Sequence, residues 1–197
     1  MNGLLASVCS AIEARIVLDS GFDVIDCKNP RDGALGALPP AAIRRIVETV
    51  RGERPTSATT GNHCGAPRDL VDAIRITADC GVDYVKFGLF EASTAASAIA
   101  VLDSVCGDHA LIAVCFVDRY DPTPLIGPLA ECGAKGIMLD TAEKSAGSLT
   151  SLWSAHRVAD FVTAVQQREM LCGLAGRLAL RDIPQLLPLQ ADYLGFR

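Results

Sequence analysis

The sequence predicts an α/β protein in which eight strands alternate with helices, the pattern of a (β/α)8 TIM barrel. Short apolar runs recur along the whole chain, with helical patterns between them. The length of 197 residues suits one domain, and half of the residues are apolar while few are aromatic. A doubly wound open sheet is the alternative, but no GxGxxG or GxxxxGK[ST] motif follows the first run. We therefore expect residues 1–197 to form a single barrel domain.

The expected strands are apolar runs of five to nine residues bounded by turn-forming residues. They cover residues 4–8, 22–28, 55–61, 84–89, 110–118, 135–140, 170–176 and 193–197. Three similar phrases, SGFDVI, CGVDYV and CGAKGI, each place a glycine just before one of these runs. Glycine readily adopts the left-handed conformation that ends a helix, so these phrases indicate a repeated helix-to-strand unit.

Apolar residues at helical spacing predict helices between the strands. One begins at Pro39 and Pro40 and continues to about residue 50, because proline suits a first helical turn. Ser93 is expected to cap another, whose apolar stripe reaches Val105, and a third covers about residues 152–167. No residues remain after the last strand, so we expect the eighth helix to be missing and the open wall to be covered by another copy of the chain.

Composition excludes several classes of partner. The formal net charge of −5 and a pI near 5.1 argue against nucleic acid or an anionic membrane, although a local basic pocket still suits an anionic substrate. No apolar run approaches the ~20 residues of a membrane span, and no basic leader is visible. Eight cysteines without a CxxC pair are typical of reduced thiols. We therefore expect a cytoplasmic protein.

Lysine is rare in this chain, with four residues beside fourteen arginines. Arginine stays protonated and cannot form a Schiff base, whereas a desolvated lysine amine can lose its proton. Lys28, Lys86 and Lys144 all follow strand-like runs, while Lys135 begins one and is interpreted as structural. Biased codon usage that removed lysine at random is the alternative explanation.

The alternation of side chains along a strand predicts where these amines lie. Asp26 and Lys28 share one face and Cys27 occupies the other. Two charges among the outer apolar helices would be costly, so we place both inside the barrel, near its C-terminal mouth. The same reasoning brings further charged residues to this mouth: Lys86, Asp118, Asp140 and, by folding back, Lys144.

Such a cluster of amines and carboxylates suits the chemistry of a class I aldolase. Repulsion between two ammonium groups and partial burial each lower the pKa of an amine, which yields a neutral nucleophile. The amine attacks a carbonyl, the iminium acidifies the adjacent C–H, and the carboxylates shuttle protons. Structural ion pairs that fill the barrel are the alternative, although such pairs rarely add stability over apolar filling.

Glycines follow the last two strands, in LAGRL and LGFR, where barrels often bind phosphate through backbone N–H groups. The candidate phosphate-binding residues are Gly176, Arg177, Gly195 and Arg197. Further candidates that line the pocket are Ser57, Thr59 and Asp118. We expect no metal site, because His63 and Cys64 lack further ligands, and His63 is a better candidate for an auxiliary acid or base.

Several segments together resemble the (5-formylfuran-3-yl)methyl phosphate synthase family. They are DVIDCKNPRDGALGA, PTSATTG, DYVKFGL, IMLDTAEKSAGSL and LAGRLALRDIP, and the resemblance extends over nearly the whole chain. It implies a (β/α)8 barrel that needs no metal or organic cofactor. It also implies a reaction early in methanofuran biosynthesis, in which two molecules of glyceraldehyde 3-phosphate condense to the furan phosphate with loss of one phosphate and of water.

The resemblance assigns roles to residues that match the family motifs. Lys28 matches the Schiff-base lysine and Asp26 the carboxylate two residues before it. Lys86 matches a second active-site lysine, and Asp140 and Lys144 match the acid and base of the LDTA-x-K motif.

Two alternatives to this function remain. One is a class I aldolase or transaldolase-like enzyme on sugar phosphates, which would release a linear product. The other is an inactive barrel that serves as a scaffold subunit. The complete set of buried amines and carboxylates argues against the inactive barrel.

Overall fold

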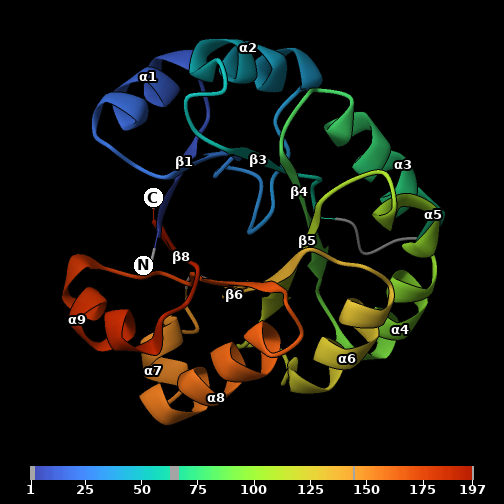
Figure 1. Cartoon of the computed structure of the whole chain (residues 1–197), viewed down its shortest axis with the longest axis vertical. Coiled ribbons are helices and arrows are strands. Elements are labelled where there is room, and N and C mark those ends of the chain that lie inside the picture. Colours follow the sequence, from blue (N-terminus) through green and yellow to red (C-terminus); the bar gives the residue numbers. More distant parts are fainter. Residues whose placement is uncertain (1–2, 63–66, 144, 197) are drawn as a thin grey trace.

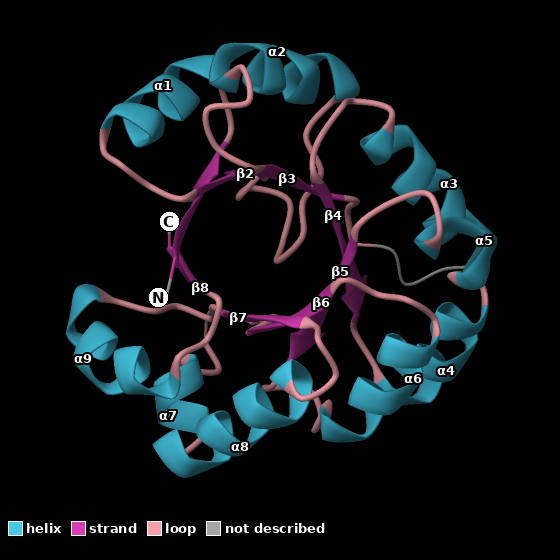
Figure 2. Ribbon diagram, viewed as in Figure 1, coloured by secondary structure: helices cyan, strands magenta, loops and turns pink. Residues whose placement is uncertain are grey.

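A closed barrel of eight parallel strands forms the centre of the molecule (Figure 2). The computed structural model describes residues 3–62, 67–143 and 145–196. Each strand pairs with the next along the chain, and the last pairs with the first. All eight predicted runs form strands, which confirms the predicted fold class. The strands are β1 (Gly3–Val8), β2 (Val24–Cys27), β3 (Thr56–Thr59), β4 (Tyr84–Leu89), β5 (Leu111–Phe116), β6 (Gly136–Asp140), β7 (Leu171–Leu174) and β8 (Tyr193–Phe196).

Helices surround the barrel on most of its circumference (Figure 1). They are α1 (Ala11–Asp19), α2 (Pro40–Val50), α3 (Pro67–Ala78), α4 (Ala92–Ala100), α5 (Asp103–Cys106), α6 (Ile126–Glu131), α7 (Leu149–Leu152), α8 (Ala155–Gln166) and α9 (Ile183–Leu186). Short 3-10 helices are η1 (Thr123–Leu125), η2 (Leu180–Asp182) and η3 (Leu187–Leu189). Within the described residues, no helix is both long and apolar enough to cross a membrane.

The predicted helix at Pro39 and Pro40 is confirmed by α2, but two other helix predictions were wrong in detail. Ser93 lies inside the first turn of α4, whose N-cap is Glu91, and α4 ends before the predicted stripe reaches Val105. The third predicted helix is divided between α7 and α8, because the Ser154 side chain accepts the Arg157 N–H and so starts a new helix.

Aspartates that directly precede three of the strands hold neighbouring strands in register. An aspartate stands directly before β2, β4 and β8, and each carboxylate accepts a backbone N–H from the adjacent strand. The pairs are Asp23 with Leu4, Asp83 with Thr56, and Asp192 with Cys172, all with N···O distances of 2.7 Å. A charged acceptor makes such a hydrogen bond strong, so these contacts stabilise the alignment that brings the interior residues to one level.

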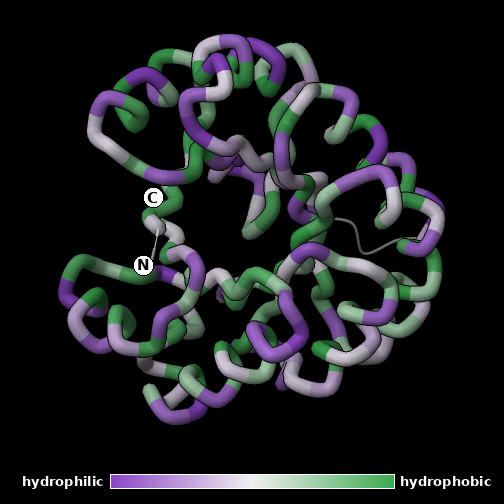
Figure 3. The backbone as a smooth tube through the Cα atoms, in the orientation of Figure 1, coloured by the Kyte–Doolittle hydropathy of each residue, from purple (hydrophilic) through white to green (hydrophobic). Residues whose placement is uncertain are grey.

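Two apolar layers are separated by the strands. The outer layer packs the helices against the barrel, and the hydropathy colours of Figure 3 show apolar residues interspersed along those helices. The inner layer fills the barrel and consists of Leu5, Leu35, Ile112, Val114, Phe116, Met138, Ala175 and Tyr193. Two members lie outside the strands: Ala175 directly follows β7, and Leu35 comes from the loop between β2 and α2.

The loop between β2 and α2 folds back into the centre of the barrel (Figure 2), a feature that sequence periodicity did not predict. Leu35 at its tip is 1% exposed. Gly88 on β4 makes room for it, since a Cβ at that position would lie 2.6 Å from a Leu35 methyl carbon. Asn62 fixes the loop by accepting the Leu35 N–H and donating to the Asp32 carbonyl. The loop therefore closes part of the C-terminal mouth.

One sector of the barrel wall has no outer helix. Among the described residues no helix follows β8, and α1 and α9 flank the side of the barrel where both ends of the chain lie (Figure 1). Ile12 and Ile16 on α1 are 76% and 61% exposed, an unusual degree for large apolar side chains on the rim of an uncovered wall.

Replacement of the loop tip tests whether the insertion stabilises the fold. Leu35→Ala should lower the free energy of unfolding by about 2–5 kcal/mol, because it leaves a cavity inside the barrel. Leu180→Ala is the matched control, since Leu180 is 81% exposed and should change stability by less than about 0.5 kcal/mol. Urea unfolding followed by circular dichroism measures both, and equal losses would contradict this account of the loop.

Candidate active site at the C-terminal mouth

Asp26 on β2 is the centre of a hydrogen-bonded cluster inside the barrel. Its side chain is fully buried, and one carboxylate oxygen lies 2.8 Å from the Lys86 Nζ of β4. The same oxygen accepts the Ser7 hydroxyl at 2.9 Å, and the other accepts the Ser57 hydroxyl at 2.7 Å. Ser7 and Ser57 stand beside Asp26 in the registers of β1 and β3. Four adjacent strands are therefore joined through one carboxylate.

A second and looser pair lies closer to solvent. Lys28 follows β2 directly, and its Nζ is 3.8 Å from an Asp140 carboxylate oxygen at the end of β6. The two side chains are 17% and 14% exposed, against 4% for Lys86. The other Asp140 oxygen accepts the Thr141 N–H. The structure thus gives each amine its own carboxylate, and it brings Lys28, Lys86, Asp26 and Asp140 together as the sequence predicted.

The two carboxylates differ in their proton affinity. Burial alone raises the pKa of Asp26, but the Lys86 ammonium, Lys28 and the Ser57 hydroxyl together lower that pKa below its ordinary value of 3.8. Burial raises the pKa of Asp140 above 3.8, and attraction by Lys28 and the Thr141 amide offsets only part of this effect. Opposite shifts of this kind separate a permanent anion from a group that exchanges protons.

A cavity of about 470 Å³ opens above these side chains. This size lies in the range of about 300–1,000 Å³ that is typical of small-molecule sites. Lys28, Lys86 and Asp140 line its floor, and Arg31 and Arg177 contribute guanidinium groups from two different loops. The cavity therefore offers two amines, a carboxylate with a raised pKa and two arginines, an arrangement suited to an anionic carbonyl compound.

The loop after β7 contributes to this cavity as predicted. Gly176 has a φ of +92° and Arg177 a φ of +52°, so both take the left-handed conformation. A Cβ at Gly176 would lie 3.0 Å from the Thr141 side chain, which favours glycine there. Gly195 on β8 also lines the cavity.

Three further candidate residues, Ser57, Thr59 and Asp118, stabilise the strands and loops around the site. The Ser57 hydroxyl donates to Asp26, and Ser57 also lines a different cavity, which opens at the N-terminal end of the barrel. The Thr59 hydroxyl donates to the Gly36 carbonyl and so anchors the inserted loop. Asp118 accepts the backbone N–H groups of Ala142 and Glu143, which fixes the start of the loop after β6.

Three predicted residues, Lys144, Arg197 and His63, lie outside the described residues. Neither Ser7 nor Arg31 was predicted as part of the site. Ser7 has the same inward parity as Leu5, a signal that was available, whereas nothing in the sequence indicated that the loop of Arg31 turns back over the mouth. Among the described side chains, no group of three His, Cys, Asp or Glu has an arrangement that could hold a metal ion. A reaction without a metal stays a prediction.

Known proteins provide an independent comparison. Residues 4–197 match the model of the family described as 4-HFC-P synthase. A Methylorubrum extorquens protein named "Putative (5-formylfuran-3-yl)methyl phosphate synthase" is 43% identical over 196 residues, which cover 98% of this chain and 80% of that protein. The (5-formylfuran-3-yl)methyl phosphate synthase of Methanopyrus kandleri is 33% identical over 208 residues, which cover 98% of this chain and 87% of the relative.

The barrel also resembles solved structures with little sequence similarity. Phosphoribosyl anthranilate isomerase from Thermus thermophilus superposes with a TM-score of 0.70 at 13% identity, over 100% of this chain and 86% of that structure. This likeness supports the fold alone.

The raised pKa of Asp140 predicts a pH dependence of stability. A carboxyl group whose pKa is higher in the folded than in the unfolded state contributes stability at low pH and loses it as pH rises from about 3.8 through the folded pKa. The Asp140→Asn variant should not show this loss. The loss in the free energy of unfolding is about 1.4 kcal/mol for each unit by which the folded pKa exceeds the unfolded pKa. Urea unfolding of both proteins from pH 4 to pH 7 measures it, and a constant difference between them would contradict the raised pKa.

Because Asp26 and Lys86 form a buried ion pair, we expect the free energy of unfolding to depend strongly on both side chains. Asp26→Asn should cost about 3–5 kcal/mol, because it leaves a buried ammonium group without its carboxylate. Asp26→Asn combined with Lys86→Met should recover most of this loss, since neither charge is then buried alone. Urea unfolding at pH 7 of the single and double variants measures the coupling, and simple additivity would show that the two side chains do not interact.

Proposed function

The chain belongs to the 4-HFC-P synthase family, and on this premise we propose that it is a lyase acting on two molecules of glyceraldehyde 3-phosphate. In this proposal the two triose phosphates condense to (5-formylfuran-3-yl)methyl phosphate, with loss of one phosphate and of water. The product serves the biosynthesis of a methanofuran-type cofactor. The names of the relatives support the product, and the amine–carboxylate cluster supports the chemistry.

The observation that carries the proposal is the contrast between the two lysines. Lys28 reaches into the cavity with a partly exposed side chain and a loose 3.8 Å contact to Asp140. Lys86 is 4% exposed and held at 2.8 Å by Asp26. A nucleophile must reach the carbonyl carbon and lose a proton, and both requirements favour Lys28. We therefore assign the Schiff base to Lys28 and a charge-holding and proton-moving role to Lys86.

The proposed reaction proceeds through an enamine. One triose phosphate is isomerised to the dihydroxyacetone phosphate form, with Lys86 or Asp140 moving protons. The Lys28 amine adds to its carbonyl and water leaves, which gives an iminium that loses an adjacent proton. The enamine then attacks the aldehyde of the second triose. Elimination of phosphate, ring closure and dehydration form the furan, and the C–N bond to Lys28 breaks so that the free amine is restored. The aromatic stability of the furan draws the sequence forward.

The carboxylates have separate tasks in this scheme. The raised pKa of Asp140 suits a group that accepts and returns protons beside the iminium. The lowered pKa of Asp26 suits a permanent anion that stabilises positive charge on the lysines. Lys144 relays protons in this proposal. No organic cofactor or metal enters, because lysine and aspartate side chains can perform iminium formation and proton transfer themselves.

Phosphate groups are held at the rim of the mouth. The backbone at Gly176, Arg177 and Gly195, with Arg197, forms one phosphate site in this proposal. Arg31 lines the same cavity from a different loop, the one after β2, and suits the second phosphate. Two separate basic positions fit a reaction that holds two phosphorylated molecules together. Ser57, Thr59 and Asp118 support the site by fixing Asp26 and the mouth loops.

We also propose a cytoplasmic homo-oligomer that binds no nucleic acid. The described cysteines are free thiols, which supports a reducing compartment. The exposed Ile12 and Ile16 beside the uncovered wall support contact with a second copy of the chain.

Light scattering after size-exclusion chromatography tests the homo-oligomer. The wild-type protein should have at least twice the mass of one chain, and Ile12→Glu combined with Ile16→Glu should yield the monomer, because charge in an apolar contact is costly. Ile76→Glu is the control, since Ile76 is also exposed but lies on α3. A wild-type monomer at micromolar concentration would refute the homo-oligomer.

Borohydride trapping with glyceraldehyde 3-phosphate tests the Schiff base. A reduced adduct should appear on Lys28 by intact mass and peptide mapping, and Lys28→Arg should abolish it together with at least about 99% of activity, because arginine forms no imine. Lys135→Arg is the matched control, since Lys135 is exposed at the opposite end of β6.

The position of the adduct and the product separate the competing outcomes. An adduct on Lys86 would reverse the assignment of the two lysines but retain the chemistry. An adduct on Lys28 without a furan absorbance band would favour an aldolase that releases a linear product. Folded protein with neither adduct nor substrate consumption would favour an inactive scaffold.

A further inference from the structure

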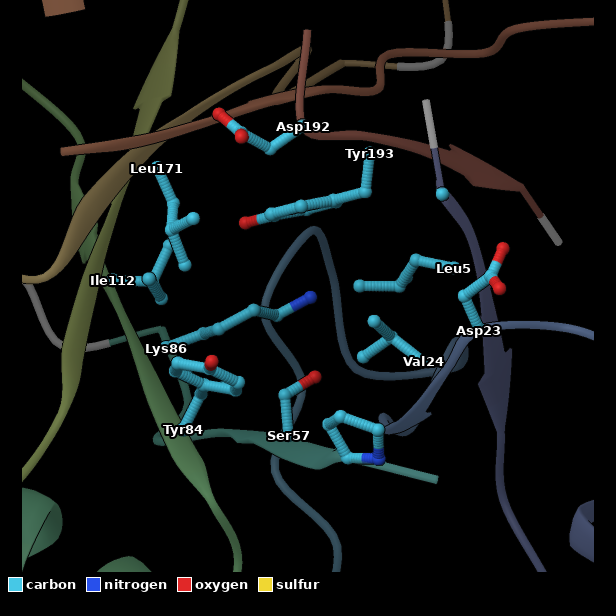
Figure 4. A pocket seen from close by; sticks show the side chains of 12 residues that line it. Leu5, Asp23, Val24, Ser57, Tyr84, Lys86, Ile112, Leu171, Asp192 and Tyr193 are labelled. Carbon is cyan, nitrogen blue, oxygen red and sulfur yellow. The ribbon is translucent and has the colours of Figure 1, made fainter. Parts of the chain in front are cut away.

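A second cavity of about 350 Å³ opens at the opposite, N-terminal end of the barrel (Figure 4). Its rim is formed where the strands begin, by residues such as Asp23, Pro55 and Asp192. Its inner end reaches Lys86, which also lines the cavity at the C-terminal mouth. Barrel enzymes use the C-terminal mouth for catalysis, so this cavity has no part in the reaction proposed above.

The walls of this N-terminal cavity are largely apolar. Leu5, Val24, Ile112 and Leu171 line it together with the ring of Tyr193. Gly173 leaves space for that ring, since a Cβ there would overlap it. A mostly apolar wall with a few convergent polar groups is typical of a small-molecule site. The volume also suffices for an aromatic ring, because an apolar cavity of about 150 Å³ in another protein binds benzene.

The polar groups at the inner end specify a hydrogen-bonding pattern. Figure 4 shows the Lys86 amine extending to the middle of the cavity between Ser57 and Tyr193. The ammonium has three protons, of which Asp26 and a weak contact to the Met138 sulfur use two. The Ser57 hydroxyl donates its proton to Asp26, so its oxygen remains an acceptor. Lys86 therefore offers a donor and Ser57 an acceptor at the inner end, beside the hydroxyl groups of Tyr84 and Tyr193, which also line the cavity.

Charge excludes ionic ligands from this cavity. The Lys86 ammonium is paired with Asp26, and the Asp23 and Asp192 carboxylates stand at the entrance. An anion would meet two carboxylates on entry, and a cation would meet an ammonium group at the inner end. A phosphorylated substrate is therefore disfavoured here, and a neutral molecule is favoured.

We propose that the N-terminal cavity binds a small neutral aromatic alcohol. Its ring packs among Leu5, Val24 and Leu171, and its hydroxyl group accepts a hydrogen bond from Lys86 and donates one to Ser57. The site gives such a molecule direct access to the buried lysine without entry through the C-terminal mouth. The inference rests on the cavity and its contacts alone, and it holds whether or not the proposed reaction is correct.

Fluorine NMR with 4-fluorobenzyl alcohol tests the site in the full chain. The probe should bind with a dissociation constant of about 1 mM, as expected for a ligand of this size. Leu171→Phe and, separately, Val24→Phe should abolish binding, because each fills the cavity with a ring. Ala142→Phe is the matched control, since it adds the same ring to the cavity at the opposite mouth and should leave binding unchanged.

Three results would overturn the proposal. The first is no binding to the wild-type protein at 10 mM probe, which is about ten times the expected dissociation constant. The second is binding retained in a folded cavity-filling variant. The third is binding lost in a folded Ala142→Phe protein. Circular dichroism verifies the folding of each variant. Should the cavity-filling variants not fold, methyl NMR of the wild-type protein decides, since the Ile112 methyl resonance should shift with the probe and an unchanged resonance would refute the site.

Two analogues test the chemical class. 4-Fluorotoluene lacks the hydroxyl group and should bind about tenfold more weakly, because Lys86 and Ser57 then lose a partner. 4-Fluorobenzoate is an anion of similar size and should not bind. Equal affinity for the toluene would disprove the polar contacts, and tight binding of the benzoate would disprove the selection for neutral molecules.

Discussion

The buried ion pair between Asp26 and Lys86 is the contact on which the rest of the site depends. Removing two charges from water is costly, and only good geometry with further hydrogen bonds compensates for that cost. Ser7 and Ser57 provide those hydrogen bonds from the strands on either side of β2. The pair keeps Asp26 ionised, leaves Lys28 to the looser Asp140, and forms the partition between the two cavities. Structure, proton affinity and access to the two amines thus have one physical origin.

The sequence predicted the strands and the inward charges because both follow from simple constraints. Alternation along a strand and the cost of an unpaired charge among apolar helices allowed one orientation for Asp26 and Lys28. The partner of each amine could not be predicted in this way, since pairing depends on register between strands that are distant in sequence. The break between α4 and α5 was also missed, because apolar spacing continued through Val101 and Leu102 although the backbone did not.

The segment after Lys28 shows how one motif combines chemistry and architecture. Lys28 supplies an amine, and the following residues build the loop that folds into the barrel. The Asn29 N–H donates to the Gly36 carbonyl, and any side chain at Gly36 would overlap the carbonyl oxygens of Asn29 and Asp32. Leu35, which directly precedes Gly36, then enters the interior of the barrel. The loop closes part of the mouth, so Gly36 is constrained by packing as closely as Lys28 is by its charged partner.

The pairing of β8 with β1 has a consequence for how the chain folds. Gly3 lies beside Tyr193, so the contact that completes the barrel joins residues near the two ends of the described chain. Closing so long a loop is entropically expensive, and contacts of this separation form slowly. During synthesis the first strand waits with an unpaired edge until the last strand has left the ribosome. An unpaired strand edge is a place where another chain can add a strand, so the incomplete barrel is more prone to association than the closed one.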